Sequence, residues 1–532
     1  MSKSIKVGVC QINPILGNFD YNYQKLLDNY NQAIDKGANL VIFPEMVVTG
    51  YPPQDLLFSK SFIKKNLEVL HNFSKKVSSP CIVGFIDEKD GKLFNSAAIC
   101  EKGKVVKVYN KILLPNYDVF DENRYFENGS EIGDFKINID GTDFTCVVQI
   151  CEDLWEDNYS RKLSEEIVTM SPDLIVNISA SPYHKNRKNI RKDLIVRNFG
   201  DANCPFVYCN LIGGQDELIF DGNSMVFNSD MNLIAEGKNF EEDLIIVDTD
   251  SGLINENEVE INNEIYSALT LGIKDYFSKT GHQKAVIGLS GGIDSALVAC
   301  LAVDALGSEN VYLVSMPSRF SSEHSKTDAK QLAQNLNAHF DTVDIDSLFE
   351  KYLDVLNPKF KGLESNVAEE NIQSRIRGNI LMAFSNKFGC LVLSTGNKTE
   401  LALGYCTLYG DMSGGLSAIG DLSKTEVYNL AKWKNKVSNN IIPDSSITKP
   451  PSAELAPNQV DPFDYDLISP IVDKIVLGED ISRDVADTDL GDIVTRINHN
   501  EHKRRQAAPV LRISKKAFGI GRRVPIVNHF DE

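Results

Sequence analysis

Short runs of β-branched and aliphatic residues recur through the first 250 positions, and each run ends in a turn followed by polar residues. Runs of roughly four to eight residues with this composition predict buried strands. Residues 21–36 and 187–200 have helix-like patterns instead, and the alternating stretch 93–109 predicts a hairpin. We therefore predict sheets that are not purely parallel. The strand candidates are residues 5–12, 39–45, 80–86, 104–111, 144–151, 173–181 and 205–214.

Strand and helix candidates alternate after residue 262, which is typical of a doubly wound α/β sheet. Residues 251–262 are polar, lack hydrophobic periodicity and predict a linker. Residues 443–465 are rich in proline and acidic side chains and predict a loop or lid. The predicted helices are 262–280, 325–337 and 366–388, and the predicted strands are 284–289, 310–318, 339–346 and 390–400.

The composition is that of a globular protein, with 42% hydrophobic and 24% charged residues. The 532 residues are too many for one ordinary core and indicate roughly two to four domains. Because 74 acidic residues outnumber 55 basic ones, the net charge of −19 gives no general attraction for nucleic acid or anionic membranes. No apolar run reaches membrane-spanning length and the N-terminus lacks a secretory pattern, so we expect a cytoplasmic protein.

The ten cysteines include no C-x-x-C pair. Cys146 and Cys151, like Cys204 and Cys209, are five positions apart, but both pairs lie in apolar, strand-like surroundings. For most of the ten we therefore predict buried, reduced thiols in preference to disulfides or a zinc site.

Residues 285–298, AVIGLSGGIDSALV, combine an apolar run, a glycine-rich turn and a helix-like pattern. Such a loop binds phosphate through backbone N–H groups and the helix dipole. It lacks the lysine of the usual ATP loop and has Asp294 instead. The simpler alternative is a tight turn with Asp294 as an acid in the first helical turn. The candidate phosphate-binding residues are Gly288, Leu289, Ser290, Gly291, Gly292, Ile293, Asp294 and Ser295.

Three reactive side chains in the first half, Glu45, Lys111 and Cys151, each come directly after a predicted strand. Open α/β folds place their chemistry at such strand ends. A thiol nucleophile needs a base and a positive group for the developing oxyanion, and these residues supply both. Taken singly, each has an ordinary explanation, since an isolated cysteine in an apolar run is mostly core and a glutamate or lysine at a strand end is mostly solvated.

The stretches FPE, NKILLPNYDVFDENRYF and QICEDLWED occur in the order of the three motifs of the nitrilase superfamily, which residues 5–250 resemble. This resemblance implies a four-layer αββα sandwich in which Cys151 attacks an amide, Glu45 is the general base and Lys111 stabilises the tetrahedral intermediate. Similarity to glutamine-using members implies a pocket for the substrate. Its expected residues are Tyr117, Ser179 and Lys185.

The stretch SGGIDS resembles the loop of ATP pyrophosphatases, ligases that cleave ATP between its α and β phosphates. In that family the loop holds pyrophosphate, so no lysine for γ-phosphate transfer is needed. Asp294 would then hold Mg²⁺, which prefers carboxylate and phosphate oxygens.

Three later stretches narrow the resemblance to the glutamine-dependent NAD synthetases. They are residues 369–386, 393–411 and the basic segment 500–526, whose interspersed apolar residues favour order over a solvated or nucleic-acid-binding tail. The resemblance implies that ATP binds the loop and that deamido-NAD binds beside it. The expected further ATP-binding residues are Thr395, Lys424 and Ser452, the expected deamido-NAD-binding residues are Asn371, Glu400, Asp411 and Lys503, and the expected metal ligands are Asp294 and Glu400.

The expected architecture is a nitrilase-like domain over residues 1–250, a linker over 251–262 and a synthetase domain over 263–532. The resemblance implies amidation of deamido-NAD through an acyl-adenylate, with ammonia from glutamine, and the products NAD, AMP, pyrophosphate and glutamate. It also implies homo-oligomers formed through the synthetase domain, with no nucleic acid or membrane as partner.

Three alternatives remain at this point. The chain could be an amidohydrolase with a regulatory ATP-binding domain, but then the basic segment has no explanation. It could be a nucleic-acid-modifying pyrophosphate-loop enzyme, against which the net charge of −19 and the amidase-like half both argue. An inactive scaffold is disfavoured because both candidate sites retain their polar residues.

Overall fold

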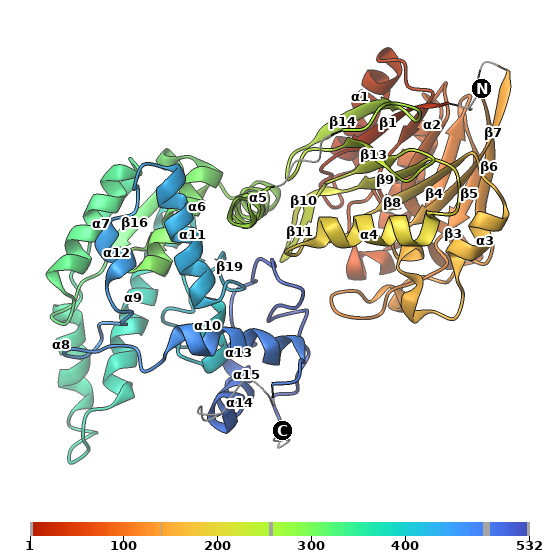
Figure 1. The fold of residues 1–532 in the computed structure, drawn as a ribbon. Coiled ribbons are helices and arrows are strands. Elements are labelled where there is room, and N and C mark those ends of the chain that lie inside the picture. Colours follow the sequence, from red (N-terminus) through yellow and green to blue (C-terminus); the bar gives the residue numbers. More distant parts are fainter. Residues whose placement is uncertain (1–3, 140, 255–258, 482–489, 529–532) are drawn as a thin grey trace. The chain divides into compact units, whose positions relative to one another are not determined.

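The computed structural model describes residues 4–139, 141–254, 259–481 and 490–528 (Figure 1). The chain forms two compact units, one of Met1–Gln215 and Ile219–Val259, the other of Asp216–Leu218 and Glu260–Glu532. None of the helices in the described ranges combines the length and the apolar composition that a bilayer crossing needs.

The first unit contains two six-stranded sheets. In the first sheet, in the order β14-β1-β2-β3-β4-β5, β1, β2 and β3 are parallel and the remaining pairs are antiparallel. This mixture confirms the prediction of sheets that are not purely parallel. The strands are β1 (Lys6–Gln11), β2 (Leu40–Ile42), β3 (Cys81–Lys89), β4 (Lys92–Glu101), β5 (Lys104–Asn110) and β14 (Asp243–Asp248).

The second sheet has the order β13-β12-β9-β8-β7-β6, with β7, β8 and β9 parallel. Its strands are β6 (Gly133–Ile139), β7 (Thr142–Ile150), β8 (Leu174–Ser179), β9 (Phe206–Asn210), β12 (Met225–Phe227) and β13 (Leu233–Glu236). A separate two-stranded ribbon consists of β10 (Ile212–Gln215) and β11 (Leu218–Asp221).

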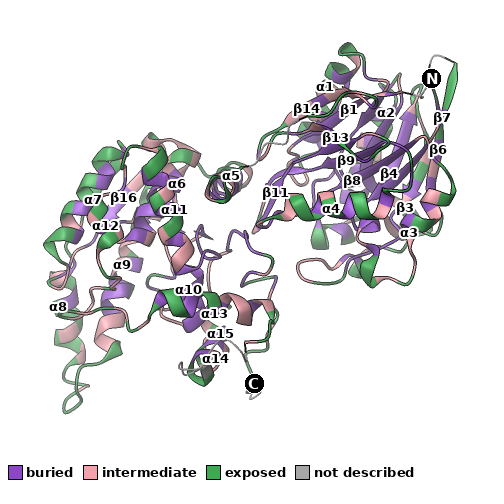
Figure 2. Cartoon of the chain, in the orientation of Figure 1, coloured by how far each residue is buried: buried purple, intermediate pink, exposed green. Residues whose placement is uncertain are grey.

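The layers of this unit run helices, sheet, sheet, helices, which is the predicted αββα order. One buried cluster joins α1 and α2 to the first sheet, and a larger one joins both sheets to each other and to α3 and α4. Figure 2 shows the central strands of the two six-stranded sheets as buried, among them β1, β8 and β9. The helices are α1 (Phe19–Asp35), α2 (Lys60–Ser74), α3 (Leu163–Thr169) and α4 (Arg187–Phe199), with short 3₁₀ helices η1 (Gln54–Phe58), η2 (Glu122–Arg124), η3 (Cys151–Leu154) and η4 (Glu156–Asn158).

The second unit has a five-stranded sheet in which every pair is parallel. Its order, β17-β16-β15-β18-β19, reverses direction at β15, so the sheet is doubly wound as predicted. Ligands of such sheets bind at the carboxyl ends of the strands near this reversal. The strands are β15 (Lys284–Gly288), β16 (Val311–Ser315), β17 (His339–Thr342), β18 (Cys390–Ser394) and β19 (Leu416–Ser417).

The helices Ile261–Thr280, Glu323–Asn335 and Val367–Phe388 agree closely with three predicted ones. The helices at 346–356, 398–403, 424–437, 465–477, 490–499 and 501–504 were not predicted, and the first two begin at the ends of the predicted strands 339–346 and 390–400. The prediction of a loop over 443–465 is wrong at one end, because residues 444–448 form a helix that begins after Pro443 and has Asp444 in its first turn. The helices are α5 (Ile261–Thr280), α6 (Ile293–Leu306), η5 (Ser308–Asn310), α7 (Glu323–Asn335), α8 (Asp346–Leu356), α9 (Val367–Phe388), α10 (Lys398–Leu403), α11 (Lys424–Val437), α12 (Asp444–Thr448), α13 (Tyr465–Leu477), α14 (Leu490–His499) and α15 (Glu501–Arg504).

The basic segment 500–526 lies within the described residues and contacts the parallel sheet of the second unit. Val510 forms a parallel bridge with Ser417 at the sheet edge, and the buried Asp421 carboxylate accepts the Ser514 backbone N–H at 2.7 Å and its hydroxyl at 2.7 Å. The segment is therefore part of the second unit's structure. The ten cysteines are all free and nine are buried, which confirms the prediction of reduced thiols.

Candidate active sites

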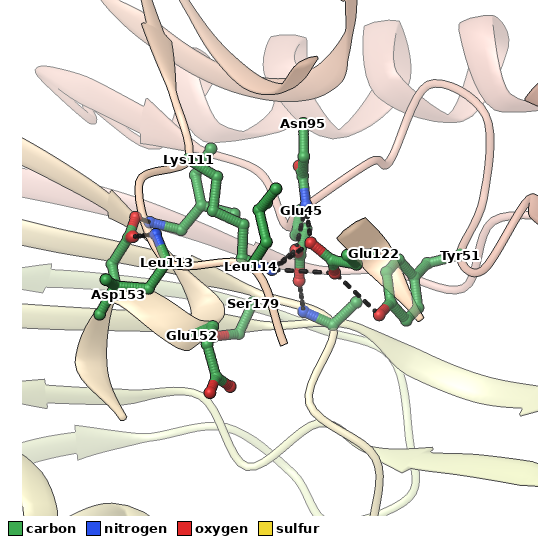
Figure 3. A network of polar contacts seen from close by, with 12 residues as sticks. Glu45, Tyr51, Asn95, Lys111, Leu113, Leu114, Glu122, Glu152, Asp153 and Ser179 are labelled. Atoms are coloured by element: carbon green, nitrogen blue, oxygen red, sulfur yellow. Dashed lines mark hydrogen bonds and ion pairs between the residues drawn. The ribbon is translucent and has the colours of Figure 1, made fainter. Parts of the chain in front are cut away.

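A buried lysine joins two carboxylates in the first unit (Figure 3). Lys111 Nζ lies 2.9 Å from Glu45 Oε1 and 2.9 Å from both carboxylate oxygens of Glu122. Glu45 follows β2, Lys111 follows β5, and Glu122 begins η2. Three segments distant in sequence therefore meet at one ammonium group.

Neutral donors complete the surroundings of the two carboxylates. Asn95 Nδ2 donates to Glu45 at 2.7 Å, and the Tyr51 hydroxyl donates to Glu122 at 3.0 Å. The backbone N–H of Ala180, just past β8, donates to Glu45 Oε2 at 2.7 Å. Glu45 is thus fixed by residues from both sheets of the unit.

Glycine at position 84 lets the Glu45 loop lie against strand β3. A Cβ at Gly84 would lie 2.3 Å from the Pro44 carbonyl oxygen and 2.4 Å from the Met46 nitrogen. Any side chain here would displace the loop that carries Glu45.

Burial and charge compete at this cluster. Burial lowers the pKa of Lys111, but the charges of Glu122 and Glu45 outweigh it and raise that pKa well above its ordinary value. Burial raises the pKa of Glu122, and Lys111 opposes this rise. Lys111 therefore stays protonated over the whole physiological range, as a group that stabilises an oxyanion must.

Cys151 directly follows β7 and begins η3 with φ of 41°, a left-handed conformation that is strained for a non-glycine residue. The thiol is buried, and its pKa is raised well above the ordinary value by burial and Glu45, with Lys111 acting in the opposite direction. Asp153 accepts the backbone N–H groups of Ile112 and Ile150, so the segments that carry Lys111 and Cys151 lie side by side. A thiol with so high a pKa needs a base to become a nucleophile.

The predicted glutamine-pocket residues have different surroundings. The Tyr117 hydroxyl donates to both oxygens of Glu152, at 3.1 and 3.0 Å, and the Tyr159 hydroxyl donates to Glu152 at 3.0 Å. Burial raises the pKa of Glu152 to about 7. Ser179 is buried at the end of β8, where its hydroxyl donates to Asn177 at 2.7 Å. Lys185 is half-buried in the loop before α4.

Arg187, two residues after Lys185, is a half-buried cation at the start of α4. Its guanidinium lies 3.8 Å from the centre of the Trp155 ring, and two of its nitrogens lie 3.4 Å from the Ser181 hydroxyl. The charges of Cys151 and Tyr117 act on the pKa of Arg187, which burial and Arg191 lower. Within the described ranges Arg187 has no carboxylate partner, so it is suited to bind an anion.

The glycine-rich loop of the second unit connects β15 to α6. Gly291 has φ of 82°, and a Cβ there would lie 2.2 Å from the Ser325 carbonyl oxygen, so only glycine fits. Inside the loop the Ser295 hydroxyl donates to the Gly292 carbonyl at 3.0 Å and lies 3.1 Å from the Ser290 hydroxyl. These contacts hold the loop open at the N-terminus of α6.

Lys424 joins two acidic side chains beside this loop. Its Nζ lies 2.6 Å from Asp294 Oδ2 and 3.1 Å from Glu400 Oε1, and Asn397 donates to Asp294 Oδ1 at 2.9 Å. Burial raises the pKa of Glu400 to about 7, with Lys424 opposing and Asp294 adding to the rise. The pair Asp294 and Glu400 fits Mg²⁺, which takes one or two carboxylates and completes its shell with phosphate and water oxygens. Nowhere in the described chain do three of His, Cys, Asp and Glu gather as a complete metal site.

A cavity of about 380 Å³ lies over the loop, within the second unit. Its lining includes every predicted ATP, deamido-NAD and metal residue of this unit except Gly291. Thr407 places two of them side by side, because its N–H donates to Asp411 at 2.8 Å and its hydroxyl to Asn371 at 2.6 Å. Lys503 donates to the Gly404 carbonyl at 2.7 Å.

Two family models match the chain. Residues 6–257 match the model for carbon-nitrogen hydrolase, and residues 265–507 match the model for NAD synthase. Glutamine-dependent NAD(+) synthetase of Thermotoga maritima is 40% identical over 591 aligned positions, which cover 100% of both chains, and that of Synechocystis is 42% identical over 98% of this chain and 99% of the relative. The chain belongs to the glutamine-dependent NAD(+) synthetases.

Solved structures agree with this family assignment. The chain superimposes on the glutamine-dependent NAD+ synthetase from Acinetobacter baumannii, in complex with adenosine diphosphate, with a TM-score of 0.81, 37% identity and 99% coverage of each chain. A synthetase from Cytophaga hutchinsonii, at 21% identity and a TM-score of 0.85, shows the same fold. The predicted family and the predicted enzyme class, a ligase, are confirmed. Neither of the two alternative enzyme classes, an amidohydrolase or a nucleic-acid-modifying enzyme, explains why the full chain matches glutamine-dependent NAD(+) synthetases.

Three charged residues at the first site of this synthetase were not predicted from the sequence: Glu122, Glu152 and Arg187. Glu122 and Glu152 both lie inside the stretches that carry the nitrilase resemblance. Arg187 is separated from Lys185 by one residue, Asn186, which has a left-handed φ of 66°, and it is Arg187 that stacks on Trp155.

We predict that Glu122→Gln lowers the free energy of unfolding of the first unit by about 3 kcal/mol, because a buried ammonium loses one of its two counter-charges. The two tryptophans, Trp155 and Trp433, lie in different units, so urea unfolding of a Trp433→Phe background reports on the first unit through Trp155 fluorescence. The control is Glu127→Gln, which removes an exposed pair with Lys92 at 3.4 Å and should cost less than about 1 kcal/mol. Equal losses in both variants would contradict the prediction.

Proposed function

We propose that this synthetase amidates deamido-NAD to NAD with ATP and glutamine, using one site in each unit. The observation that carries the proposal is that each unit holds a buried lysine between two carboxylates, one beside a thiol and one beside a phosphate-binding loop. Glutamate, AMP and pyrophosphate are the other products.

At the first site Glu45 takes the proton of the Cys151 thiol as its sulfur attacks the amide carbon of glutamine. The developing oxyanion faces the Lys111 ammonium, which stays charged because two carboxylates hold it. Glu45 then delivers the proton to the leaving nitrogen, the C–N bond of the tetrahedral intermediate breaks, and ammonia departs while a thioester to Cys151 remains. Water activated by Glu45 hydrolyses the thioester and releases glutamate.

Two charged groups beside Cys151 are suited to the two ends of the amino-acid substrate. The Glu152 carboxylate would bind the α-ammonium group, and the Arg187 guanidinium would bind the α-carboxylate. Tyr117 orients Glu152 through its two hydrogen bonds and would line the same pocket with Ser179 and Lys185.

At the second site the backbone N–H groups of residues 288–295 would hold the pyrophosphate portion of ATP. The nicotinate carboxylate attacks the α-phosphorus, giving an acyl-adenylate and pyrophosphate, and ammonia then displaces AMP. Thr395, Lys424 and Ser452 would contact ATP, while Asn371, Asp411 and Lys503 would contact the dinucleotide. Asp294 and Glu400 would hold Mg²⁺, which neutralises phosphate charge.

The division of labour follows the division of the chain. We assign residues 1–250 to glutamine hydrolysis, 251–262 to a linker and 263–532 to synthesis, in keeping with family matches over 6–257 and 265–507. We further propose that copies of the chain associate through the synthetase unit.

We predict that Cys151→Ala abolishes glutamine-driven NAD synthesis, with a loss of at least about 10³-fold. NAD synthesis driven by a high concentration of ammonium salt should stay within about twofold of the wild type, since Cys151 plays no part in adenylation. Formation of NAD and AMP is measured with each nitrogen source. Loss of both activities in a folded variant would contradict two separable sites.

We predict that the KM for glutamine falls as the pH rises from 6 to 8. A carboxylic acid with a pKa of about 7 is charged only above that pH, and only charged Glu152 attracts the substrate ammonium group. One pH unit below the pKa, KM should be about tenfold higher than its plateau. In Glu152→Gln the KM should be high and flat across this range, whereas Glu166→Gln, at a half-buried pair with Arg161, should keep the wild-type profile. A flat wild-type profile would refute the assignment.

A further inference from the structure

Asp153 is a fully buried carboxylate two residues beyond the nucleophile, and the mechanism above gives it no role. Its Oδ1 accepts the backbone N–H groups of Ile112 at 3.1 Å and Leu113 at 2.9 Å. Its Oδ2 accepts the Tyr109 hydroxyl at 2.7 Å and the Ile150 backbone N–H at 2.9 Å. Four neutral donors thus converge on one side chain. Figure 3 shows one of them, Leu113, beside Asp153.

The four donors bracket the two reactive residues of the site. Tyr109, Ile112 and Leu113 lie on either side of Lys111 at the end of β5 in the first sheet. Ile150 immediately precedes Cys151 at the end of β7 in the second sheet. One carboxylate therefore ties the segment that carries the lysine to the segment that carries the thiol.

The conformation of the nucleophile makes this tie necessary. Cys151 has φ of 41°, and the turn that begins there is closed by the hydrogen bond from the Ile150 N–H to Asp153. A strained residue persists only where its surroundings hold it. Glu45 and Glu122 already fix the position of the Lys111 ammonium. The distance from this ammonium to the Cys151 thiol therefore depends on where the Cys151 turn lies.

Only an acceptor matches all four donors. A carboxylate offers about four lone-pair sites and no proton. An amide of the same shape would turn an NH₂ group toward two of the donors. The Tyr109 hydroxyl can rotate to accept, but a backbone N–H cannot.

We propose that Asp153 is a positioning residue that sets the register between the Cys151 thiol and the Lys111 ammonium during thioester formation. The inference rests on the proposed glutaminase chemistry of the first site. Asp153 touches neither the substrate nor the reacting atoms, and it acts through the two backbone segments that it joins.

The test measures glutamate release by the full-length Asp153→Asn variant. We expect kcat to fall by about 100-fold, the scale of a 1 Å misplacement of reacting groups. KM for glutamine should change by less than about threefold, because Arg187 lies on α4, away from the segments that Asp153 joins, and Glu152 keeps its hydrogen bonds to Tyr117 and Tyr159. NAD synthesis from ammonium salt should be unchanged.

The matched control is Glu156→Gln. Glu156 is also a buried carboxylate of this loop, but among the described residues its side chain accepts only from Ser164, whose backbone N–H lies at 2.9 Å. Its kcat should stay within about twofold of the wild type even if both variants melt at lower temperature. A kcat of Asp153→Asn within about threefold of the wild type, or equal losses of kcat in both variants, would overturn the proposal.

Tyr109→Phe provides a milder second variant in case Asp153→Asn does not fold. It removes one donor on the lysine side and leaves the Cys151 turn intact. We expect kcat to fall by about tenfold with KM unchanged, and an unchanged kcat would overturn the role of Asp153. If the wild type releases no glutamate at all, the proposed function fails first, and the inference fails with it.

Discussion

The first site depends on burying the Lys111 ammonium between two carboxylates. A buried cation without partners would cost several kcal/mol, and even a paired one is stable only when hydrogen bonds satisfy its surroundings. Asn95, Tyr51 and the Ala180 backbone provide those bonds to Glu45 and Glu122. Because these groups come from both six-stranded sheets, the charge cluster forms only in the folded sandwich, and its hydrogen bonds in turn connect the two sheets. This arrangement keeps the Lys111 ammonium group protonated in the unit that carries the Cys151 thiol.

The second unit uses the same arrangement for different chemistry. Lys424 holds Asp294 and Glu400, and lies 5.4 Å from the Tyr465 ring centre. Here the lysine faces a cavity instead of a closed thiol site, so that the carboxylates are available to a cation and phosphates. In the proposed mechanism the lysine of the first unit stabilises a transient oxyanion, whereas the lysine of the second unit orders two acids beside the phosphates of ATP. On this proposal, the two clusters separate ammonia production from carboxylate activation.

Much of the fold could be predicted because it follows from local patterns of apolar residues and glycines. Apolar runs located the strands of both sheets, and the glycine turn located the β15–α6 junction. Other features depend on tertiary structure and leave no local trace. Glu122 follows no strand, and it meets Lys111 only because η2 folds back over the end of β5. Helix α12 was missed because its short sequence, DSSIT, offers no apolar periodicity.

The most direct test of the proposed mechanism follows the amide nitrogen of glutamine. The wild-type chain is incubated with deamido-NAD, Mg·ATP and amide-¹⁵N glutamine, and the NAD and adenine nucleotides are analysed. The proposed mechanism predicts ¹⁵N in the carboxamide of NAD and one AMP for each NAD formed. Glutamate release without labelled NAD, or ADP in place of AMP, would contradict it.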